Sequence, residues 1–230
     1  MPMLTHFHLN VTKSTNDYAK LCAGKTKMPI LVTADTQTEG RGRRGKSFYS
    51  PDKTGLYMSV MIDEPADFNL ITPAAALAVC EVIEKRFAVQ PQIKWVNDIY
   101  LEGKKICGIL CERVTAENKN YIVIGIGINL TTEDFPADIP NGGSIGKDYD
   151  KQILSEMIFH KLLHYFTLKN KTILRRYKNK CFVIGKNITY IKDNEIKNGK
   201  AVDINDECNL IVELNGKRDT LSSGEISIKF

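Results

Sequence analysis

The stretch TEGRGRRGKSFYSP, residues 38–51, holds four cations within the six positions from Arg41 to Lys46. Residues 40–45 spell G-x-G-x-x-G, the pattern of dinucleotide-binding turns. That turn requires a strand that ends at the first glycine and a helix that begins at the last. Here a polar run, Asp35–Glu39, precedes the glycines, and no helical period follows them. The sequence therefore predicts a basic loop between strands, which can bind phosphate or carboxylate oxygens; a solvated charged loop is the alternative.

The composition is that of an ordinary globular protein, with 43% hydrophobic and 26% charged residues among 230. This length suits one large domain, or a main domain followed by a small one, and it suffices for a full core. The net charge of +5 arises from 32 basic and 27 acidic residues. Such a modest excess favours anionic ligands and does not by itself imply DNA binding.

The six cysteines form no C-x-x-C pair, and no cluster of His and Cys has the spacing of a zinc site. We therefore expect buried free thiols and no metal site. The N-terminus lacks a charged-then-apolar signal segment, and no apolar run approaches the roughly 20 residues of a membrane span. These features predict a cytoplasmic protein that does not associate with membranes.

Capping residues predict one helix start at Ser14 or Thr15 and another at Thr72, with Pro73 in the first turn. The segment 131–146 is rich in Pro, Gly and Asp and has no period, which predicts a mobile loop. The other predicted helices are at 74–87, 151–168 and 171–180. Strands are predicted at 30–34, 55–62, 93–95, 98–101, 105–111 and 120–130. The last four of these strands form an antiparallel meander.

The character of the sequence changes after Gly185. Four short apolar runs, at 188–191, 200–203, 209–214 and 225–229, are separated by glycine and asparagine turns, which is typical of a small separate β-barrel. The predicted fold is therefore α+β: a mixed, largely antiparallel sheet packed with helices, followed by a small barrel. The predicted domains are residues 1–183 and 184–230.

Four segments carry residues that suit chemistry, and they occur in a fixed order. They are the basic loop, Lys94-Trp-Val-Asn-Asp98, Gly103-Lys-Lys-Ile-Cys-Gly-Ile-Leu-Cys-Glu112 and Ile124-Gly-Ile-Gly-Ile-Asn-Leu130. Together they resemble the GRGRxGR, KWPND, GxKxxGILxE and GxGxN segments of biotin protein ligases. The early residues Ser14-Thr-Asn16 and Gln37 and the late segment Gly224–Ile228 match the family as well. The resemblance thus covers nearly the whole chain, and it implies a class II synthetase-like catalytic domain followed by an SH3-like barrel.

The resemblance implies an enzyme that joins biotin and ATP, with Mg²⁺, into biotinyl-5′-AMP. The biotinyl group then passes to a lysine of a biotin carboxyl carrier protein domain. A carboxylate that attacks a phosphate brings negative charges together, so cations must neutralise them in the transition state. Arg43 is the first candidate for the phosphate, and Lys105 is implied as the main catalytic lysine, with a solvated hairpin lysine as the alternative. The residues implied in nucleotide binding are Arg43, Arg44, Lys46, Phe48, Lys94, Asn97 and Asn129.

Asp98 is the candidate that orients or deprotonates the attacking lysine of the carrier, because that lysine is protonated in water. The alternative for Asn97 and Asp98 is a simple Asx turn. The ureido ring of biotin needs fixed donors and acceptors in an apolar slot. For Ser14 and Thr15, helix capping is the competing role. The residues implied in biotin binding are Ser14, Thr15, Asn16, Gln37, Gly40, Arg41, Gly42, Lys105 and Gly108.

Three glycines, Gly108, Gly125 and Gly127, lie on adjacent predicted strands. Glycine weakens a strand, so it usually marks a close approach by a ligand or by backbone. The loop that follows Asn129 carries Phe135, and we expect it to close over adenine and exclude water.

The sequence departs from the family pattern at three positions. Val96 stands where proline is usual, which makes the turn before Asn97 less stiff. Phe48 stands where tryptophan is common, and Lys46 replaces the last arginine of the basic motif. None of these changes removes a charge that the chemistry requires.

Two other functions compete with biotin ligation. A lipoate ligase has a similar fold and similar adenylate chemistry, although the KW-ND segment and the paired glycines favour biotin. A nucleic-acid-binding regulator would use the basic loop and the barrel. Some biotin ligases repress transcription through an N-terminal helix-turn-helix, but only 13 residues precede Ser14, so we expect no operator binding. The oligomeric state is open between a monomer and a homodimer.

Overall fold

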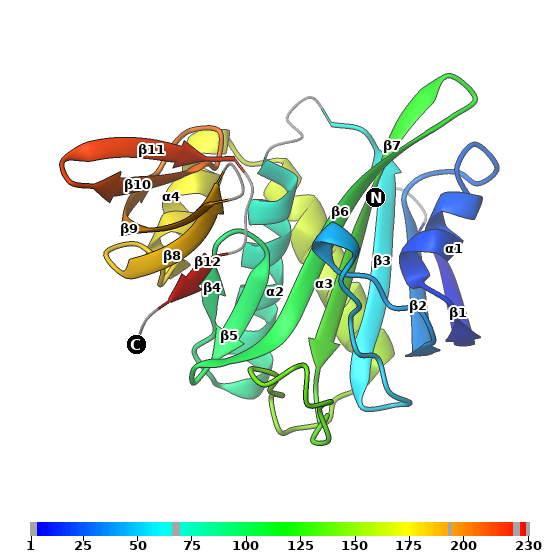
Figure 1. Ribbon diagram of the computed structural model, residues 1–230. Helices are drawn as coiled ribbons and strands as arrows, with labels where there is room; N and C mark the ends of the chain where they lie inside the picture. The colour runs from blue at the N-terminus through cyan, green and yellow to red at the C-terminus, as the bar shows by residue number, and fades with distance from the viewer. Residues whose placement is uncertain (1–3, 66–69, 193–194, 223–225, 229–230) are drawn as a thin grey trace.

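The computed structural model of the chain describes residues 4–65, 70–192, 195–222 and 226–228. Figure 1 shows a large sheet with helices against it and a small second sheet to one side. The elements in chain order are β1 (Thr5–Thr12), α1 (Thr15–Leu21), β2 (Ile30–Gln37), the short 3₁₀ helix η1 (Arg43–Gly45), β3 (Gly55–Asp63), α2 (Ile71–Phe87), β4 (Gln92–Lys94), β5 (Asp98–Leu101), β6 (Lys104–Ala116), β7 (Lys119–Asn129), α3 (Lys151–Phe166), α4 (Asn170–Lys180), β8 (Asn187–Lys192), β9 (Glu195–Ile204), β10 (Leu210–Leu214), β11 (Lys217–Leu221) and β12 (Ile226–Ile228).

The large sheet has seven strands in the order β1-β2-β3-β7-β6-β5-β4, and the small sheet has five in the order β11-β10-β9-β8-β12. Within the described residues, β1 and β2 pair in parallel and all other strand pairs are antiparallel. The predicted meander is confirmed as β4 to β7. The predicted α+β class, with a mixed and largely antiparallel sheet and a separate small sheet at the C-terminal end, is confirmed too.

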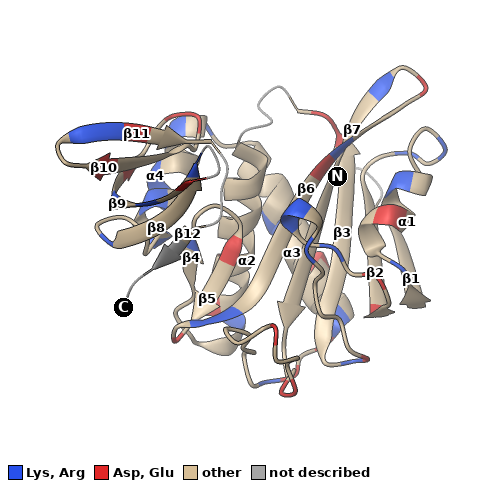
Figure 2. Ribbon diagram, viewed as in Figure 1, with Lys and Arg blue, Asp and Glu red and all other residues tan. Residues whose placement is uncertain are grey.

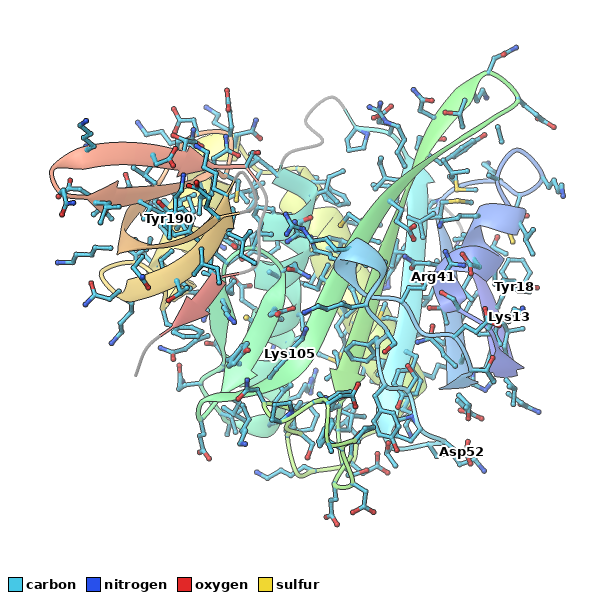
Figure 3. All side chains as sticks on the ribbon, in the orientation of Figure 1. Lys13, Tyr18, Arg41, Asp52, Lys105 and Tyr190 are labelled. Carbon is cyan, nitrogen blue, oxygen red and sulfur yellow. The ribbon has the colours of Figure 1, made fainter. Side chains whose placement is uncertain are left out.

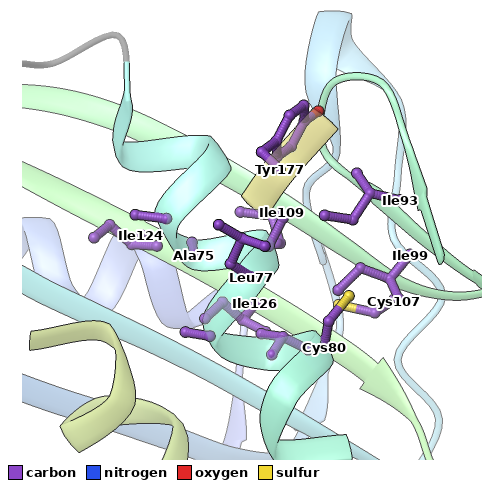
Figure 4. Close-up of a cluster of buried hydrophobic side chains, with 14 of the residues drawn as sticks. Ala75, Leu77, Cys80, Ile93, Ile99, Cys107, Ile109, Ile124, Ile126 and Tyr177 are labelled. Atoms are coloured by element: carbon purple, nitrogen blue, oxygen red, sulfur yellow. The ribbon is translucent and has the colours of Figure 1, made fainter. Parts of the chain in front are cut away.

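Helices α2 and α3 cover one face of the large sheet (Figure 1). Helix α2 is apolar along most of its length, and its alanines let it lie close to the sheet. In Figure 4, Ala75 and Leu77 of this helix face Ile109 of β6 and Ile124 of β7, all of which are buried. Each large apolar side chain buried in this way contributes about 1.5–3 kcal/mol. This core fixes the positions of β6 and β7, whose other face carries the candidate site.

Helix α1 lies against the opposite face of the sheet, over β2, β3 and β7. The alternation of side chains along β2 explains how one strand serves both faces: Leu31 joins the core under α2, while Ile30 and Val32 pack with Ala19 of α1. The basic loop also runs over this second face (Figure 1). The face therefore combines α1, the basic loop and the glycine-bearing strands.

Several element boundaries differ from those predicted. Strand β2 continues through polar residues to Gln37, because pairing with β1 extends to that position. Helix α2 begins at Ile71, before Thr72, so the prediction of Thr72 as its cap is wrong. Ser14 does precede α1, yet its side chain makes no capping hydrogen bond. The Ser14 hydroxyl therefore does not cap helix α1.

The small sheet contains one strand that the sequence did not reveal. Strand β11, Lys217-Arg-Asp-Thr-Leu221, is too polar to signal a strand, and its pairing with β10 forms it instead. The last predicted strand is present as β12; Gly224, Glu225 and Lys229 lie outside the described residues.

The small sheet is joined to the large one through the segment that precedes Asn97. The indole Nε1 of Trp95 donates a hydrogen bond to the carbonyl of Cys208 in the turn between β9 and β10, at 2.9 Å. The hydroxyl of Tyr177 in α4 donates to the carbonyl of Val96 at 2.8 Å. The peptide bond between Trp95 and Val96 is cis.

The expectation of free thiols is confirmed, since all six cysteines are free. Four of them, Cys80, Cys107, Cys181 and Cys208, are buried. No helix in the described part of the chain is long and apolar enough to span a bilayer.

Candidate active site

A cavity of about 380 Å³ opens on the face of the sheet that carries the basic loop. The basic loop, the β5–β6 hairpin, the loop 131–146 and Ile226 of β12 form its walls. Basic segments at η1 and at the start of β6 lie along this side of the molecule (Figure 2). The cavity gathers most of the residues predicted from sequence: Arg41, Gly42, Arg43, Arg44, Lys46, Phe48, Lys94, Asn97, Asp98, Lys105, Gly108 and Asn129.

Lys105 and Asp98 form an ion pair in this cavity, with 2.7 Å between Nζ and Oδ1. The side chain of Lys105 is 34% exposed and that of Asp98 is 22% exposed, so both remain open to the cavity. Figure 3 shows Lys105 at the start of β6, on the face that carries the basic loop. The alternative of a solvated hairpin lysine does not describe this environment.

A β-bulge directs Lys105 into the cavity. Ile99 of β5 pairs with Cys107, but the next residue, Tyr100, pairs with Lys105, so Ile106 is left as an extra residue. Ile106 and Cys107 are consequently both buried in the core. Lys105 comes to lie on the same face as Gly108, where an added Cβ would be 3.5 Å from Lys105 Cε. Bulges often redirect a side chain next to an active site in this way.

The guanidinium of Arg43 reaches over the cavity to the KW-ND turn, which is the segment Lys94–Asp98. Its Nη1 donates to Asn97 Oδ1 at 3.2 Å, and Asn97 Nδ2 donates to the carbonyl of Ile109 at 2.8 Å. Burial, and after it the charge of Arg44, lower the pKa of Arg43, while Asp98 acts in the opposite direction. Arginine stays protonated in proteins, so Arg43 is a partly desolvated cation that an anionic ligand would stabilise. The Asn97 side chain supports Arg43 and the strand, which is more than an Asx turn requires.

The other cations of the site differ in their surroundings. Arg41 lies beside α1 in Figure 3 and pairs with Asp17 of that helix at 2.8 Å. Lys94 Nζ lies 5.5 Å from the centre of the Tyr100 ring. Arg44 and Lys46 are exposed on the basic loop. Arg43 and Lys105 are thus two cations that side-chain contacts to Asn97 and Asp98 hold in the cavity.

A narrower slot adjoins the cavity beneath α1, and it contains the predicted hydroxyl and amide groups. It is lined by Ser14, Thr15, Asn16, Gln37, Arg41, Phe48 and Gly108, together with Met58, Leu110, Gly125, Ile126 and Gly127. Gln37 Oε1 accepts from the backbone N–H of Thr15 at 2.8 Å, and Gln37 Nε2 donates to Ser50 Oγ at 2.9 Å. Gly40 lines neither space, because it packs against the Phe48 carbonyl, 2.4 Å from where its Cβ would be.

The ring of Phe48 fills most of this slot. An added Cβ would meet the ring at 2.3 Å on Gly127 and at 3.2 Å on Gly108. The open volume that remains is about 20 Å³, which is room for a single water molecule. The close approach predicted for these two glycines is therefore made by an aromatic side chain of the basic loop. On Gly125 the approaching group is Asn16, whose Oδ1 would lie 2.3 Å from an added Cβ.

Asn129 ends β7 at the edge of the cavity. Its Nδ2 donates to the carbonyl of Gly143 at 2.9 Å, but its buried Oδ1 has no hydrogen-bond partner. A buried acceptor without a partner is costly, so a ligand N–H or O–H there would stabilise the site.

The loop 131–146 is irregular, as predicted, but its second half is held in place. Lys105 N–H donates to the Asn141 carbonyl at 2.8 Å, and Gly143 N–H donates to the Lys105 carbonyl at 3.0 Å. Near its first half, the rings of Phe135 and Tyr49 lie 6.2 Å apart, centre to centre, which joins this loop to the basic loop.

Two residues of the site were not assigned a role from the sequence. Ser59, in the middle of β3, is fully buried and contacts both Thr15 and Asn16. Glu112, in β6, accepts hydrogen bonds from Asn16 Nδ2 at 2.8 Å and from Lys20 at 2.7 Å. The signal for Ser59 was a lone serine in an otherwise apolar strand; that for Glu112 was its place at the end of the GILxE segment.

Comparison with known proteins identifies the family. Residues 8–129, more than half of the chain, match the sequence model of the biotin/lipoate A/B protein ligase family. The chain belongs to this family. A second model, of the biotin protein ligase C-terminal domain, matches residues 183–229. The first match includes every predicted site residue from Ser14 to Asn129, so the family motifs and the cavity coincide.

Relatives within the biotin/lipoate ligase family include the bifunctional ligase/repressor BirA of Bacillus subtilis, which is 33% identical over 216 residues. That match covers 86% of this chain and 66% of the relative, so the chain spans just under two thirds of the relative's length. The BirA of Escherichia coli is 30% identical, with 96% of this chain and 73% of the relative covered. Among solved structures, the biotin protein ligase of Aquifex aeolicus in complex with biotin and ATP has a TM-score of 0.82 at 24% identity, with 98% of each chain covered, and supports the fold.

Proposed function

We propose that this protein is an ATP-dependent biotin ligase that forms biotinyl-5′-AMP and transfers the biotinyl group to a lysine of a biotin carboxyl carrier protein domain. The observation that carries the proposal is the junction of the polar slot with the cavity that holds Arg43, Lys105 and Asp98. A carboxylic acid whose ring lies in the slot would extend its carboxylate toward these cations. The family match and the names of the relatives support the same reaction.

In the first step, a carboxylate oxygen of biotin attacks the α-phosphorus of ATP. The bond from that phosphorus to the bridging oxygen breaks, and pyrophosphate leaves with the electron pair. Negative charge on the carboxylate and the phosphate converges as this happens. The ammonium of Lys105 and the guanidinium of Arg43 reduce this repulsion, and both are fixed by contacts to the KW-ND turn.

In the second step, the ε-amine of the carrier lysine attacks the acyl carbon, an amide forms and AMP leaves. The amine must first lose its proton. Asp98 is the proposed acceptor, because it is a partly exposed carboxylate that lines the cavity. Before substrate binds, Asp98 is paired with Lys105. Once Lys105 binds the adenylate instead, Asp98 is available to the incoming amine.

Nucleotide binding is proposed for Arg43, Arg44, Lys46, Phe48, Lys94, Asn97 and Asn129, and biotin binding for the slot residues together with Lys105. In the described part of the chain, no group of three or more His, Cys, Asp or Glu is placed to hold a metal ion. Mg²⁺ is accordingly proposed to arrive as part of the substrate, bound to the phosphate oxygens of ATP. We also propose that residues 1–183 form the catalytic domain and residues 184–230 a small C-terminal domain.

The decisive experiment is to incubate the protein with biotin, Mg-ATP and a biotin carrier domain, and then to measure the mass of the carrier. A gain equal to one biotinyl group is the expected result. A parallel reaction with lipoate and a lipoyl carrier domain tests the other activity of the family. Transfer of lipoate without transfer of biotin would overturn the proposal.

A further inference from the structure

Ser59 lies behind Thr15 and Asn16, two residues that line the slot, and is fully buried where α1 packs on β3. Its oxygen lies 2.6 Å from Asn16 Oδ1 and 2.7 Å from Thr15 Oγ1. Both contacts are short enough to need a proton between the oxygens, but Ser59 has only one proton to donate. The direction of each bond therefore follows from what the two partners are able to do.

Glu112 determines the orientation of the Asn16 amide. The hydrogen bonds from Lys20 and Asn16 hold the pKa of Glu112 below its usual value, although burial alone would raise it. An ionised carboxylate only accepts hydrogen bonds, so the group that faces it at 2.8 Å is the Asn16 nitrogen. The Asn16 oxygen must then face Ser59.

These assignments fix the proton of Thr15. An amide oxygen cannot donate, so Ser59 O–H donates to Asn16 Oδ1. The 2.7 Å contact between Ser59 and Thr15 then requires Thr15 O–H to donate to Ser59. Gln37 Oε1 is a second acceptor within reach of the Thr15 hydroxyl, at 3.1 Å, but the 2.7 Å contact with Ser59 is the shorter of the two and takes the proton. Glu112, Asn16, Ser59 and Thr15 thus form a chain of hydrogen bonds with one direction.

The chain leaves two acceptors exposed to a ligand in the slot. The lone pairs of Thr15 Oγ1 remain available, because its proton points inward to Ser59. Gln37 Oε1 uses one lone pair for the Thr15 N–H and keeps the other, and the Gln37 amide is oriented by its bond to Ser50. A ureido ring carries two N–H donors, and the dithiolane ring of lipoate carries none. Two acceptors side by side therefore distinguish these two ligand classes.

We propose that Ser59 is a positioning residue that selects the ureido ring by keeping the proton of Thr15 out of the slot; this inference rests on the proposed function. Without the Ser59 hydroxyl, the Thr15 proton turns to Gln37 Oε1 at 3.1 Å. Gln37 Oε1 then accepts from both the N–H and the O–H of Thr15, and its second lone pair is no longer available. One N–H of the ureido ring loses its acceptor in a buried site.

The test is a double-mutant cycle on biotin affinity, measured by isothermal titration calorimetry with wild type, Ser59→Ala, Thr15→Val and the double variant. Ser59→Ala should weaken biotin binding about tenfold, as expected when a buried donor loses its partner. In the Thr15→Val background, Ser59→Ala should cause no further loss, because no Thr15 proton remains to be misdirected. At saturating biotin, the rate of pyrophosphate release by Ser59→Ala should equal that of wild type.

Ser155→Ala is the matched control. Ser155 is as buried as Ser59 and donates to the Gln152 carbonyl at 2.8 Å, but it lies in α3 on the other face of the sheet. This variant should bind biotin as wild type does. Equal losses for Ser59→Ala in both backgrounds, or no loss in either, would overturn the inference. Failure of the wild-type protein to bind biotin would instead contradict the proposed function itself.

Discussion

Lys105 Nζ lies 2.7 Å from Asp98 Oδ1, so the two groups proposed for successive steps of the reaction are paired with each other. This pairing keeps the ammonium in the cavity and neutralises the carboxylate. An anionic ligand that takes Lys105 as its partner would release Asp98. The same contact can therefore put the two steps in order, with the amine acceptor becoming available only after the acid has been activated.

Lys105→Ala should reduce the rate of adenylate formation about 10²–10³-fold, because single electrostatic contacts of this kind have effects of that size. The charge that Lys105 faces is most concentrated in the transition state, so the rate should fall more than the affinity for substrate. Pyrophosphate release measures the rate, and circular dichroism checks folding. Lys104→Ala is the control: Lys104 is exposed, is not among the residues that line the cavity, and donates to the Pro140 carbonyl. A larger loss in the Lys104 variant would show that the wrong lysine was chosen.

Arg43→Gly should weaken retention of the adenylate more than it weakens binding of biotin. Arg43 contacts the KW-ND turn and not the slot, and losing one charge-assisted contact to phosphate costs about 1.5–3 kcal/mol. The adenylate should then escape into solution before transfer to the carrier. Chromatography of the reaction mixture measures free biotinyl-5′-AMP. Retention as long as in wild type would remove Arg43 from its proposed role.

Biotin and ATP together should slow hydrogen exchange in the basic loop, from Gln37 to Pro51, and in the loop from Thr131 to Gly146. Loops that close over ligands belong to the least stable parts of a fold. The gain in the second loop should be concentrated in residues 133–140, because Asn141 and Gly143 are already bonded to Lys105. Equal exchange with and without ligands would exclude closure of either loop.

Trp95→Phe should lower the free energy of unfolding by about 1–3 kcal/mol, because it leaves the buried carbonyl of Cys208 without a donor. Tyr177→Phe removes the second anchor of the same segment, at Val96, and should have an effect of similar size. Urea denaturation followed by circular dichroism measures both. A change below 0.5 kcal/mol, roughly that of an ordinary surface substitution, would show that these bonds do not hold the segment.

The sequence predicted the meander, and most of the predicted site residues do line the cavity, because hydrophobic periodicity and ordered motifs are local signals. It could not explain why Lys105 faces the cavity. Strict alternation from Gly108 would turn Ile106 and Lys104 to that face, and the bulge at Ile106 reverses this. β11 was missed since its polar residues become a strand only by pairing with β10. The role of Ser59 depends on the directions of hydrogen bonds, which arise only when α1, β3 and β6 meet.

The position of Phe48 bears on the rate of ligand association rather than on affinity. Its ring occupies the space over Gly108 and Gly127, so a ligand that enters the slot must replace a side chain of the protein and not only water. The entry of biotin is then limited by how often the basic loop lifts its own ring away. At high biotin concentration the observed rate of association would reach a plateau, and the height of that plateau would be the opening rate of the loop.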